Sequence, residues 1–566
     1  MSIAKPLSHS PLVGALLVGL FAALTALPGI TALPPLDRDE SRFMQASVQM
    51  LETGDYVSIS FQDAERNKKP AGSYWAQAAS VAAFSSVETR APWAHRTPSL
   101  VAAVVGVLFV YFIGRRLFDP DTALFGALLM AGAPSLAGEA TIAKSDALLF
   151  ASVALMQLGL AGVVASLRDE AGPRRTDAAL FWIGLGLGAL IKGPVAPMIG
   201  VLTVAGLSLS SSRIALWKGL RPISGVLVAA AIVAPWTLAI TLETEGRFIA
   251  EAMGTDGLAK VTEAQEEHGA PPGLHLALLP VLFWPAAPFL LSGAASALRA
   301  EKERPGDGLP LLMLAAWAVP AWLVFEIATT KLPHYTLPLY PALALIAARM
   351  IARPPERLDL VRLSAAFYAL TGVLFAALLI AIPAFGSSAH SWRSPPLYAD
   401  VAAGALIVAT LTTVVLAWRG ALRAAAVGAA VGGAILAWSV LEITLPAADR
   451  LDLSRRIAAE LDEADFHPRL DGAPDAVLTG YYEPSAVFLL GTNTLLAEPG
   501  PAGAAYADRN GAAVVEAAAS EAFCAALAEA GGGARAFSHL EGFNYSKGRE
   551  VRISFYRRAE DVRGCV

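Results

Sequence analysis

The chain has 566 residues, of which 55% are hydrophobic and only 16% are charged, and its mean hydropathy is +0.53. A chain this apolar cannot be a set of soluble domains, so the composition indicates an integral membrane protein. The formal net charge of −5 gives no sign of nucleic-acid binding.

Long apolar windows follow one another from Pro11 to Leu445. About thirteen of them have the roughly 20 residues that a helix needs to cross a bilayer. The first window also resembles a signal peptide, but its length and the similar windows that follow favour a membrane anchor. The predicted spans are 11–31, 98–117, 121–137, 146–167, 178–191, 194–211, 222–242, 275–293, 309–328, 335–352, 362–384, 398–417 and 423–445.

Arginine and lysine gather in alternate turns between these windows, as at Arg115 and Arg116 or at Arg419 and Arg423. Short cytoplasmic loops retain such residues, so these turns are predicted to face the cytoplasm, with the N-terminus. An odd number of spans then places the tail after Leu445 outside. The predicted outer loops are 32–97, 138–145, 243–274 and 385–397.

Lysines at outer helix ends run against this rule, and the chain has three of them, Lys144, Lys192 and Lys331. Each one alone is explained by a side chain that reaches the lipid headgroups or completes a helix end. All three lie in short turns beside proline, glycine or an acidic residue. Together they indicate a shared anion such as phosphate.

The first outer loop contains two predicted helices. Residues 40–51 have apolar side chains at helical spacing, and a second apolar helix is expected to begin at Lys69 and Pro70. Helices of this kind lie on the membrane surface with one face in the lipid. Asp39 has the position of an N-cap of the first helix, and Asp146 opens the fourth span, so each carboxylate is either a cap or a site residue.

The motifs that run along the chain from 11 to 445 resemble, in order, those of one family. It is the bacterial GT-C class of integral-membrane glycosyltransferases, in the branch that contains lipid A aminoarabinose transferases and protein O-mannosyltransferases. The matching residues are Asp39, Glu40 and Arg42; Gly54, Asp55 and Tyr56; Lys69, Pro70, Tyr74 and Trp75; Ser145 and Asp146; Lys192, Gly193 and Pro194; and Lys331, Leu332, Pro333 and Tyr335.

This resemblance implies an all-α polytopic membrane domain over 1–446, with interfacial helices in its first outer loop. It implies an enzyme of the bacterial inner membrane, with a periplasmic active site, that moves a sugar from a polyprenyl phosphate to lipid A or another envelope glycolipid. Attack on the sugar is expected to invert its anomeric centre. No cofactor or metal is expected, and the protein is expected to be a monomer.

Roles for individual residues follow from the chemistry of that transfer. Negative charge grows on the leaving phosphate, which cations stabilise, while carboxylates suit the sugar and the acceptor. Asp39 is the predicted base if the acceptor is a hydroxyl, whereas a phosphate acceptor needs no base and leaves Asp39 to orient it. The predicted catalytic residues are Asp39, Asp146 and Glu40. The predicted phosphate-binding residues are Lys69, Lys192, Lys331, His334, Tyr335 and Arg42, and those for sugar or acceptor are Tyr74, Trp75 and Lys144.

The sequence departs from the family at Lys68, where aminoarabinose transferases usually have glutamate before the Lys-Pro pair. The added positive charge suits an acidic sugar such as a uronic acid, although a solvated surface lysine explains it equally well. Loop 243–274 contains acidic residues and a histidine that could suggest a metal site, but exposed glutamates of this kind usually solvate a loop. These residues are Glu263, Glu266, Glu267 and His268.

After Pro446 the composition changes, and residues 447–566 are predicted to form a small periplasmic α/β domain. An amphipathic helix over 450–464 is followed by two strand–helix pairs and a strand over 549–558, with loops around EPGPAGAAYADRNGAA and EAGGGARA. The compartment permits a disulfide between Cys524 and Cys565. The domain is expected to recognise the acceptor or to pack on the outer loops.

Other classes of function stay open at this point. A protein O-glycosyltransferase fits the same motifs. A lipid flippase would instead place charged or broken helices at mid-bilayer, whereas the unusual charges here cluster at outer helix ends. A scaffold protein would leave the charged turns without a role.

Overall fold

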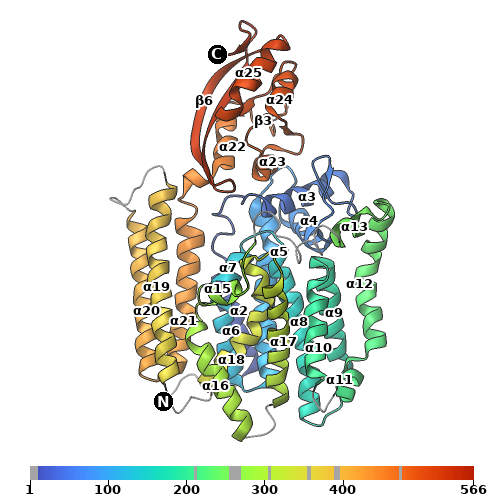
Figure 1. Cartoon of the computed structure of the whole chain (residues 1–566), viewed down its shortest axis with the longest axis vertical. Coiled ribbons are helices and arrows are strands. Elements are labelled where there is room, and N and C mark those ends of the chain that lie inside the picture. The colour runs from blue at the N-terminus through green and yellow to red at the C-terminus, as the bar shows by residue number, and fades with distance from the viewer. Residues whose placement is uncertain are drawn as a thin grey trace.

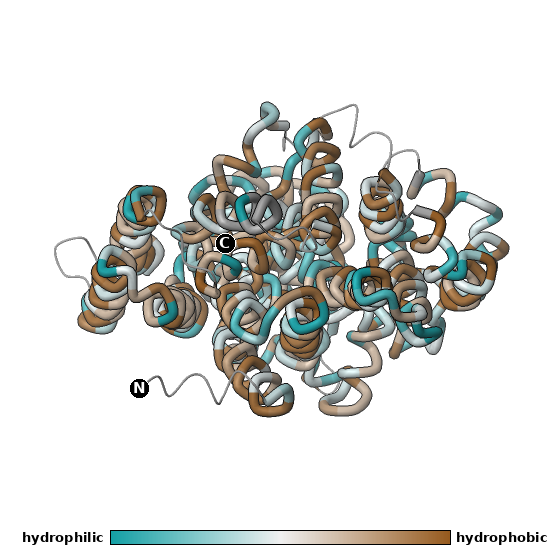
Figure 2. Tube along the Cα trace, turned by 90° about the horizontal axis from the view of Figure 1, so that it is seen from below, coloured by the Kyte–Doolittle hydropathy of each residue, from teal (hydrophilic) through white to brown (hydrophobic). Residues whose placement is uncertain are grey.

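The computed structural model describes residues 10–209, 213–253, 269–303, 308–352, 358–387, 396–470 and 474–566. A bundle of long helices carries a smaller domain at one end, and the first outer loop lies between the two (Figure 1). Viewed along the bundle, hydrophobic residues predominate on the helices (Figure 2). Leucine and valine side chains of the peripheral helices α19 (Asp359–Gly386) and α20 (Leu397–Trp418) are exposed on the outside, as expected where lipid surrounds a protein.

The chain is a multi-span membrane protein. Among the described residues, eight helical segments are long and apolar enough to cross a bilayer, or up to ten if each of two bent pairs is one span. They include α5 (Pro92–Leu117), α8 (Asp146–Arg168), α12 (Pro222–Glu243), α17 (Gly308–Ile327), the segment of η2 (Pro333–Leu339) and α18 (Tyr340–Ala352), and α21 (Leu422–Ala437) with η3 (Trp438–Thr444). The predicted number of thirteen spans is therefore not confirmed.

Two predicted spans are broken helices, and the breaks have a local cause. Predicted span 121–137 is α6 (Pro120–Ala131) and α7 (Pro134–Ala140), bent by 61°, and span 275–293 begins as α15 (Leu274–Leu282) and α16 (Ala287–Glu303), bent by 114°. Pro134 and Pro285 lie at the breaks and cannot donate the backbone hydrogen bond that would continue the first helix.

Three further predicted spans contain shorter helices. They are α2 (Pro11–Ala26), α9 (Arg175–Lys192) and α10 (Val195–Leu207). On the predicted cytoplasmic side the chain forms α11 (Arg213–Leu220), and on the other side α13 (Arg247–Met253) follows α12.

The first outer loop forms the two predicted helices, α3 (Asp39–Thr53) and α4 (Gly72–Phe84), with a hairpin of β1 (Ser60–Phe61) and β2 (Ala64–Glu65) between them. Gly54 ends α3 in the left-handed conformation, with φ of +72°. Almost every residue from Glu40 to Met50 is buried. Protein therefore covers α3 on both sides, in place of the lipid expected on one side.

The C-terminal domain has a six-stranded mixed sheet in the order β4-β3-β5-β7-β6-β8. Helices α22 (Leu453–Glu463) and α23 (Pro484–Leu490) cover one face, and α24 (Pro499–Tyr506) and α25 (Ser520–Glu529) cover the other. The strands are β3 (Val477–Thr479), β4 (Leu495–Leu496), β5 (Ala513–Glu516), β6 (Gly533–Asn544), β7 (Arg549–Arg558) and β8 (Gly564–Cys565), and the chain enters the domain through η4 (Asp449–Leu451).

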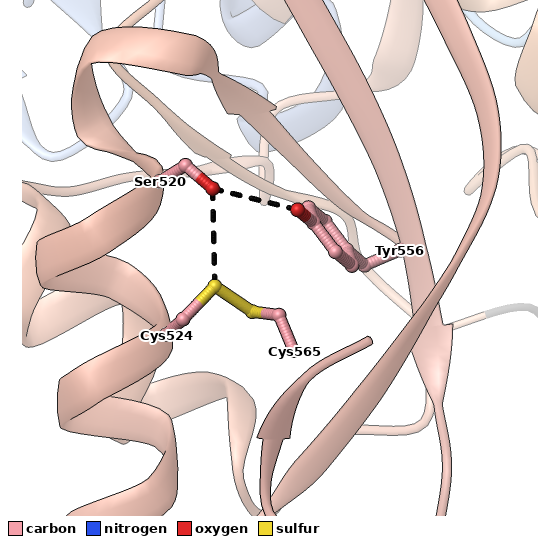
Figure 3. Close-up of a disulfide and its surroundings, with 4 residues drawn as sticks. All are labelled: Ser520, Cys524, Tyr556 and Cys565. Carbon is pink, nitrogen blue, oxygen red and sulfur yellow. Dashed lines mark hydrogen bonds between the residues drawn. A yellow bond between two sulfur atoms is a disulfide. The ribbon is translucent and has the colours of Figure 1, made fainter.

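The predicted elements of this domain are confirmed, but the two predicted loops were partly wrong. Residues 499–506 form α24, which Pro499 begins as a favourable first helical residue. Residues 533–544 form β6, the longest of the described strands, which pairs with β7 from Ala534 to Asn544. Cys524 and Cys565 form a disulfide that ties α25 to β8 (Figure 3).

The C-terminal domain contacts the first outer loop through charged and polar side chains. Arg90 donates to Gln45 at 2.7 Å, to Glu52 at 2.8 Å and to the Phe488 carbonyl at 3.0 Å. Phe488 of α23 also lies in an apolar cluster with Met44, Val48 and Ala143. Residues of the bundle, the loop and the domain thus share one interface.

Candidate active site

Four helices and one turn bring charged side chains together at the bundle end that carries the C-terminal domain. Glu139 lies in α7, Lys144 in the turn that follows, Asp146 is the first residue of α8 and Lys192 is the last residue of α9. His334 comes from η2. The glycine after Lys192, Gly193, has φ of +60°, a conformation that ends α9 and leaves the lysine at the helix end.

The carboxylate of Asp146 is the centre of this cluster. Lys192 Nζ donates a hydrogen bond to Asp146 Oδ1, and Lys144 Nζ lies 3.7 Å from Oδ2. His334 bridges the two acids, with Nε2 3.6 Å from Asp146 Oδ1 and Nδ1 3.6 Å from Glu139 Oε1. Lys144 Nζ lies 3.4 Å from Glu139 Oε2. Asp146 therefore binds side chains from other elements and does not cap its own helix.

The cations of the site are held by these acids. Burial alone would lower the pKa of Lys144, but the charges of Glu139 and Asp146 outweigh it and raise that pKa, so Lys144 stays protonated. Lys192 Nζ also lies 5.4 Å from the centre of the Tyr335 ring, a cation–π contact. Tyr335 packs edge-on against His334.

Asp39 and Lys69 lie at the edge of the same cluster. Asp39 acts electrostatically on Lys144, and Lys69 acts on His334. The Asp39 side chain is 58% exposed, and its Oδ1 lies 3.8 Å from Arg66 Nη2. Asp39 is the first residue of α3, and Arg38 holds the N-cap position, so the predicted capping role of Asp39 is wrong. The carboxylate is open to a ligand.

Glu40, predicted as catalytic, is enclosed by protein. Its two oxygens accept from Arg96 Nε at 2.8 Å and Nη2 at 2.9 Å. They also accept from the backbone N–H groups of Leu36 and Ala143, both at 2.8 Å. Since Glu40 is 1% exposed and Arg96 is fully buried, this pair connects the first outer loop to α5 and to the turn before Asp146.

Other predicted residues have contacts with groups outside the cluster. Lys331 is buried, and its Nζ donates to the Ala270 carbonyl at 2.8 Å, in the outer loop before α15. Tyr74 stacks on Phe43 and accepts from Arg66 at 3.3 Å. Trp75 donates to the Tyr56 carbonyl at 2.8 Å.

Arg42 is half-buried on α3 and Lys68 is exposed. The acidic group at Glu263, Glu266, Glu267 and His268 lies outside the described residues. Across the described ranges, no group of three or more His, Cys, Asp or Glu side chains has the arrangement of a metal site.

Glu139 was missed by the sequence reasoning, although it is an acid directly after an apolar window and five residues before Lys144. Arg66 and Arg96 were missed because both lie in a loop where bases look solvated. Only the contacts of these side chains in the fold reveal their places.

Comparisons with known proteins show what this chain is similar to. Residues 68–238 match the family described as dolichyl-phosphate-mannose-protein mannosyltransferase. An undecaprenyl phosphate-alpha-4-amino-4-deoxy-L-arabinose arabinosyl transferase of Edwardsiella ictaluri is 27% identical over 406 residues, which cover 70% of this chain and 69% of that protein. The protein of the same name from Pseudomonas paraeruginosa is 28% identical over 450 residues, which cover 77% and 76%.

Solved structures share the fold. The crystal structure of ArnT from Cupriavidus metallidurans bound to undecaprenyl phosphate matches with a TM-score of 0.71 and 19% identity, over 96% of this chain and 97% of that one. The archaeal oligosaccharyltransferase AglB from Archaeoglobus fulgidus matches with a TM-score of 0.50 and 14% identity, over 91% and 70%. The fold is therefore that of the GT-C integral-membrane glycosyltransferases. Within that class the chain is related to the aminoarabinose transferases, which confirms the resemblance predicted from its motifs.

Proposed function

We propose that this protein transfers a sugar from a polyprenyl-phosphate donor to lipid A or another envelope glycolipid. The observation that carries the proposal is the buried cluster in which Lys144 and Lys192 contact Asp146, at the end of the bundle beside the first outer loop. The names of the relatives support the donor class, an aminoarabinose carried on undecaprenyl phosphate, and the acceptor class follows from the resemblance of the motifs to those of lipid A aminoarabinose transferases.

The charges of this cluster suit a phosphate that changes its charge during the reaction. Glu139 and Asp146 balance Lys144 and Lys192, and Lys69 adds a further positive charge at the edge. A donor phosphate entering here replaces part of the carboxylate contact of Lys192. The lysines then stabilise the negative charge that grows on the phosphate as the sugar leaves.

In the transfer, the bond between the anomeric carbon and the phosphate oxygen breaks, and its electron pair stays on the phosphate. An acceptor oxygen attacks the opposite face of the sugar, which inverts the anomeric centre. An ionised phosphate acceptor has no proton to lose, so Asp39 orients it or stabilises the positive sugar ring. A hydroxyl acceptor passes its proton to Asp39, which is exposed enough to meet it.

The distribution of arginines supports a periplasmic site in a bacterial inner membrane. The ion pairs of Arg116 with Asp177 and of Arg349 with Asp119 lie at the bundle end opposite the cluster. Arginine-rich ends remain cytoplasmic, so the cluster and the C-terminal domain face the periplasm. The predicted boundary between residues 446 and 447 falls between η3 and η4.

The test is transfer by the purified protein in lipid nanodiscs, supplied with undecaprenyl-phosphate aminoarabinose and lipid A. A mass gain of one aminopentose on lipid A supports the proposal, and the Asp146→Asn variant is expected to abolish that gain. If cells with and without this protein have identical lipid A masses, and the purified protein modifies no glycolipid, the acceptor class is wrong.

Transfer to a protein is the second candidate, because the family that matches residues 68–238 is described as a protein mannosyltransferase. It predicts a hexose on periplasmic proteins and no change in lipid A. Intact-mass analysis of both fractions from the same cells separates the two candidates.

A further inference from the structure

The first outer loop and the C-terminal domain enclose a cleft of about 710 Å³ beside the C-terminal half of α3, at the other end of that helix from Asp39. We call it the junction cleft. One wall comes from α3 and the β1–β2 hairpin, and the other from β4 and the turn before it, with Asp475 from the segment before β3 and Arg509 from the turn after α24. We propose that the junction cleft binds a neutral or amine-bearing saccharide.

The chemistry of the walls points to a polyhydroxylated ligand. Amides and hydroxyls predominate, including those of Gln49, Gln62, Asn493 and Thr494. The Asn493 amide has both a donor and an acceptor, which matches a sugar hydroxyl that donates and accepts at once, and Gln62 keeps its side-chain oxygen as an acceptor. A lipid tail or a peptide core would require an apolar lining instead.

The polar groups of the hairpin are held in place before any ligand binds. Gln62 donates to the carbonyls of Thr492 at 3.0 Å and Thr494 at 2.6 Å. Its own N–H donates to Gln49 Oε1 at 2.8 Å, and its φ is +54°, a strained value for a residue other than glycine. The hairpin is therefore hydrogen-bonded to the turn before β4.

Thr494 supplies an independent indication of a ligand. Its side chain is only 2% exposed, it lines the cleft, and its hydroxyl has no hydrogen-bond partner among the described residues. A buried hydroxyl without a partner is unfavourable, so a group that enters the cleft and bonds to it is stabilised.

The charge of the walls selects among saccharides. Asp55, Asp63 and Asp475 outnumber the single cation, Arg509, among the lining residues. This excess of carboxylates attracts an amino sugar and repels a phosphorylated one. The junction cleft thus has the opposite preference to the lysine-rich cluster beside Asp146.

The position of the cleft suggests what the saccharide belongs to. The helix that supplies Gln49 to the cleft begins with Asp39 at the reaction site. A saccharide held in the cleft is therefore the carbohydrate part of the acceptor that extends away from the membrane. This last assignment rests on the proposed function, whereas saccharide binding itself does not.

Saturation-transfer NMR on the full-length protein in nanodiscs tests the binding. The probes are a glucosamine disaccharide, its N-acetylated form and its phosphorylated form, and we expect affinity to fall in that order. Thr494→Val and Asp63→Asn are each expected to weaken binding of the glucosamine disaccharide about tenfold, whereas the exposed Glu560→Gln is not. The proposal is overturned if no probe binds, if the phosphorylated probe binds best, or if both cleft variants bind like the unchanged protein.

Kinetics with two acceptors test the assignment to the acceptor. With an acceptor that has outer sugars, Asp63→Asn is expected to raise KM severalfold without changing kcat. With lipid A trimmed to its two glucosamines, KM stays unchanged. Equal KM changes for both acceptors overturn the assignment. If no acceptor is glycosylated, the proposed function fails, while the NMR result still decides whether the cleft binds saccharides.

Discussion

Lys192, the last residue of α9, donates a hydrogen bond to Asp146, the first residue of α8, across a separation of 46 residues. The contact forms because both helices begin or end at the same end of the bundle. It puts one carboxylate between two lysines, and that arrangement sets the expected behaviour of the variants below.

Asp146→Asn is expected to reduce transfer at least 100-fold, because it removes the charge that holds Lys144, Lys192 and His334 in one arrangement. Asp177→Asn is the matched control, since it removes a buried carboxylate from an ion pair with Arg116 at the other end of α9. Rates are measured on variants of equal melting temperature. Equal losses in both variants would mean that Asp146 matters only for folding.

Lys192→Gln is expected to raise KM for the donor about tenfold, since a charge-assisted contact to the phosphate is lost. Lys331→Gln is expected to change the donor KM less, because Lys331 donates to backbone carbonyls. Donor titrations at saturating acceptor give both values. A larger change of the donor KM in Lys331→Gln than in Lys192→Gln would mean that Lys331 binds the phosphate, as the sequence predicts.

Asp39→Asn separates the two roles of this carboxylate. If the acceptor atom is a phosphate oxygen, the variant is expected to lose less than tenfold in kcat, because no proton is transferred. If the acceptor atom is a hydroxyl, general-base catalysis contributes about 10²–10⁴-fold and is lost. The kcat is measured across pH 5 to 9. Full activity on a hydroxyl acceptor would exclude Asp39 as the base.

Glu40→Ala is expected to destabilise the protein by about 3–5 kcal/mol, because Arg96 then stays buried without its partner charge. The carboxylate of Glu52 is 29% exposed, and Glu52→Ala breaks its pair with Arg90. This variant is expected to lose less stability than Glu40→Ala. Thermal unfolding in nanodiscs compares the two. If Glu40→Ala melts normally but is inactive, Glu40 takes part in the reaction as first predicted.

Asp37 is expected to make the attachment of the C-terminal domain sensitive to pH. It lies in the loop before α3 and accepts a hydrogen bond from Ser485, and burial raises its pKa from the usual 3.8 to about 7. The folded state holds this proton over a range in which the unfolded chain has lost it. Stability therefore falls as pH rises from about 4 to 7.

Asp37→Asn is expected to remove this fall and to raise the melting temperature at pH 8 by roughly 3 °C or more. Melting curves at pH 5 and pH 8 measure the effect. Asp561→Asn, at an exposed pair with Arg535, is the control. An unchanged pH dependence in Asp37→Asn would assign the effect to other carboxylates, such as Asp452, whose pKa is also raised by burial.

Local patterns in the sequence were sufficient for much of the fold. Apolar length predicts the membrane helices, and alternating residues such as those of 549–558 predict a strand, because each signal depends on neighbours along the chain. The elements that were missed have weak local signals. Residues 533–544 begin among glycines and become a strand by pairing with β7, and 499–506 look like a loop because of their prolines and glycines.

The candidate site was likewise predictable from the sequence only in part. Its motifs and its excess of outer lysines are visible in the sequence, since charge at a helix end depends only on order along the chain. Which charges meet was decided by the tertiary structure. Packing of α7, α8, α9 and η2 brings Glu139, Lys192 and His334 to Asp146. In the same structure Glu40 is enclosed with Arg96, and Lys331 donates to backbone carbonyls. Contacts between residues far apart in sequence arise only when the helices pack, so no local pattern specifies them.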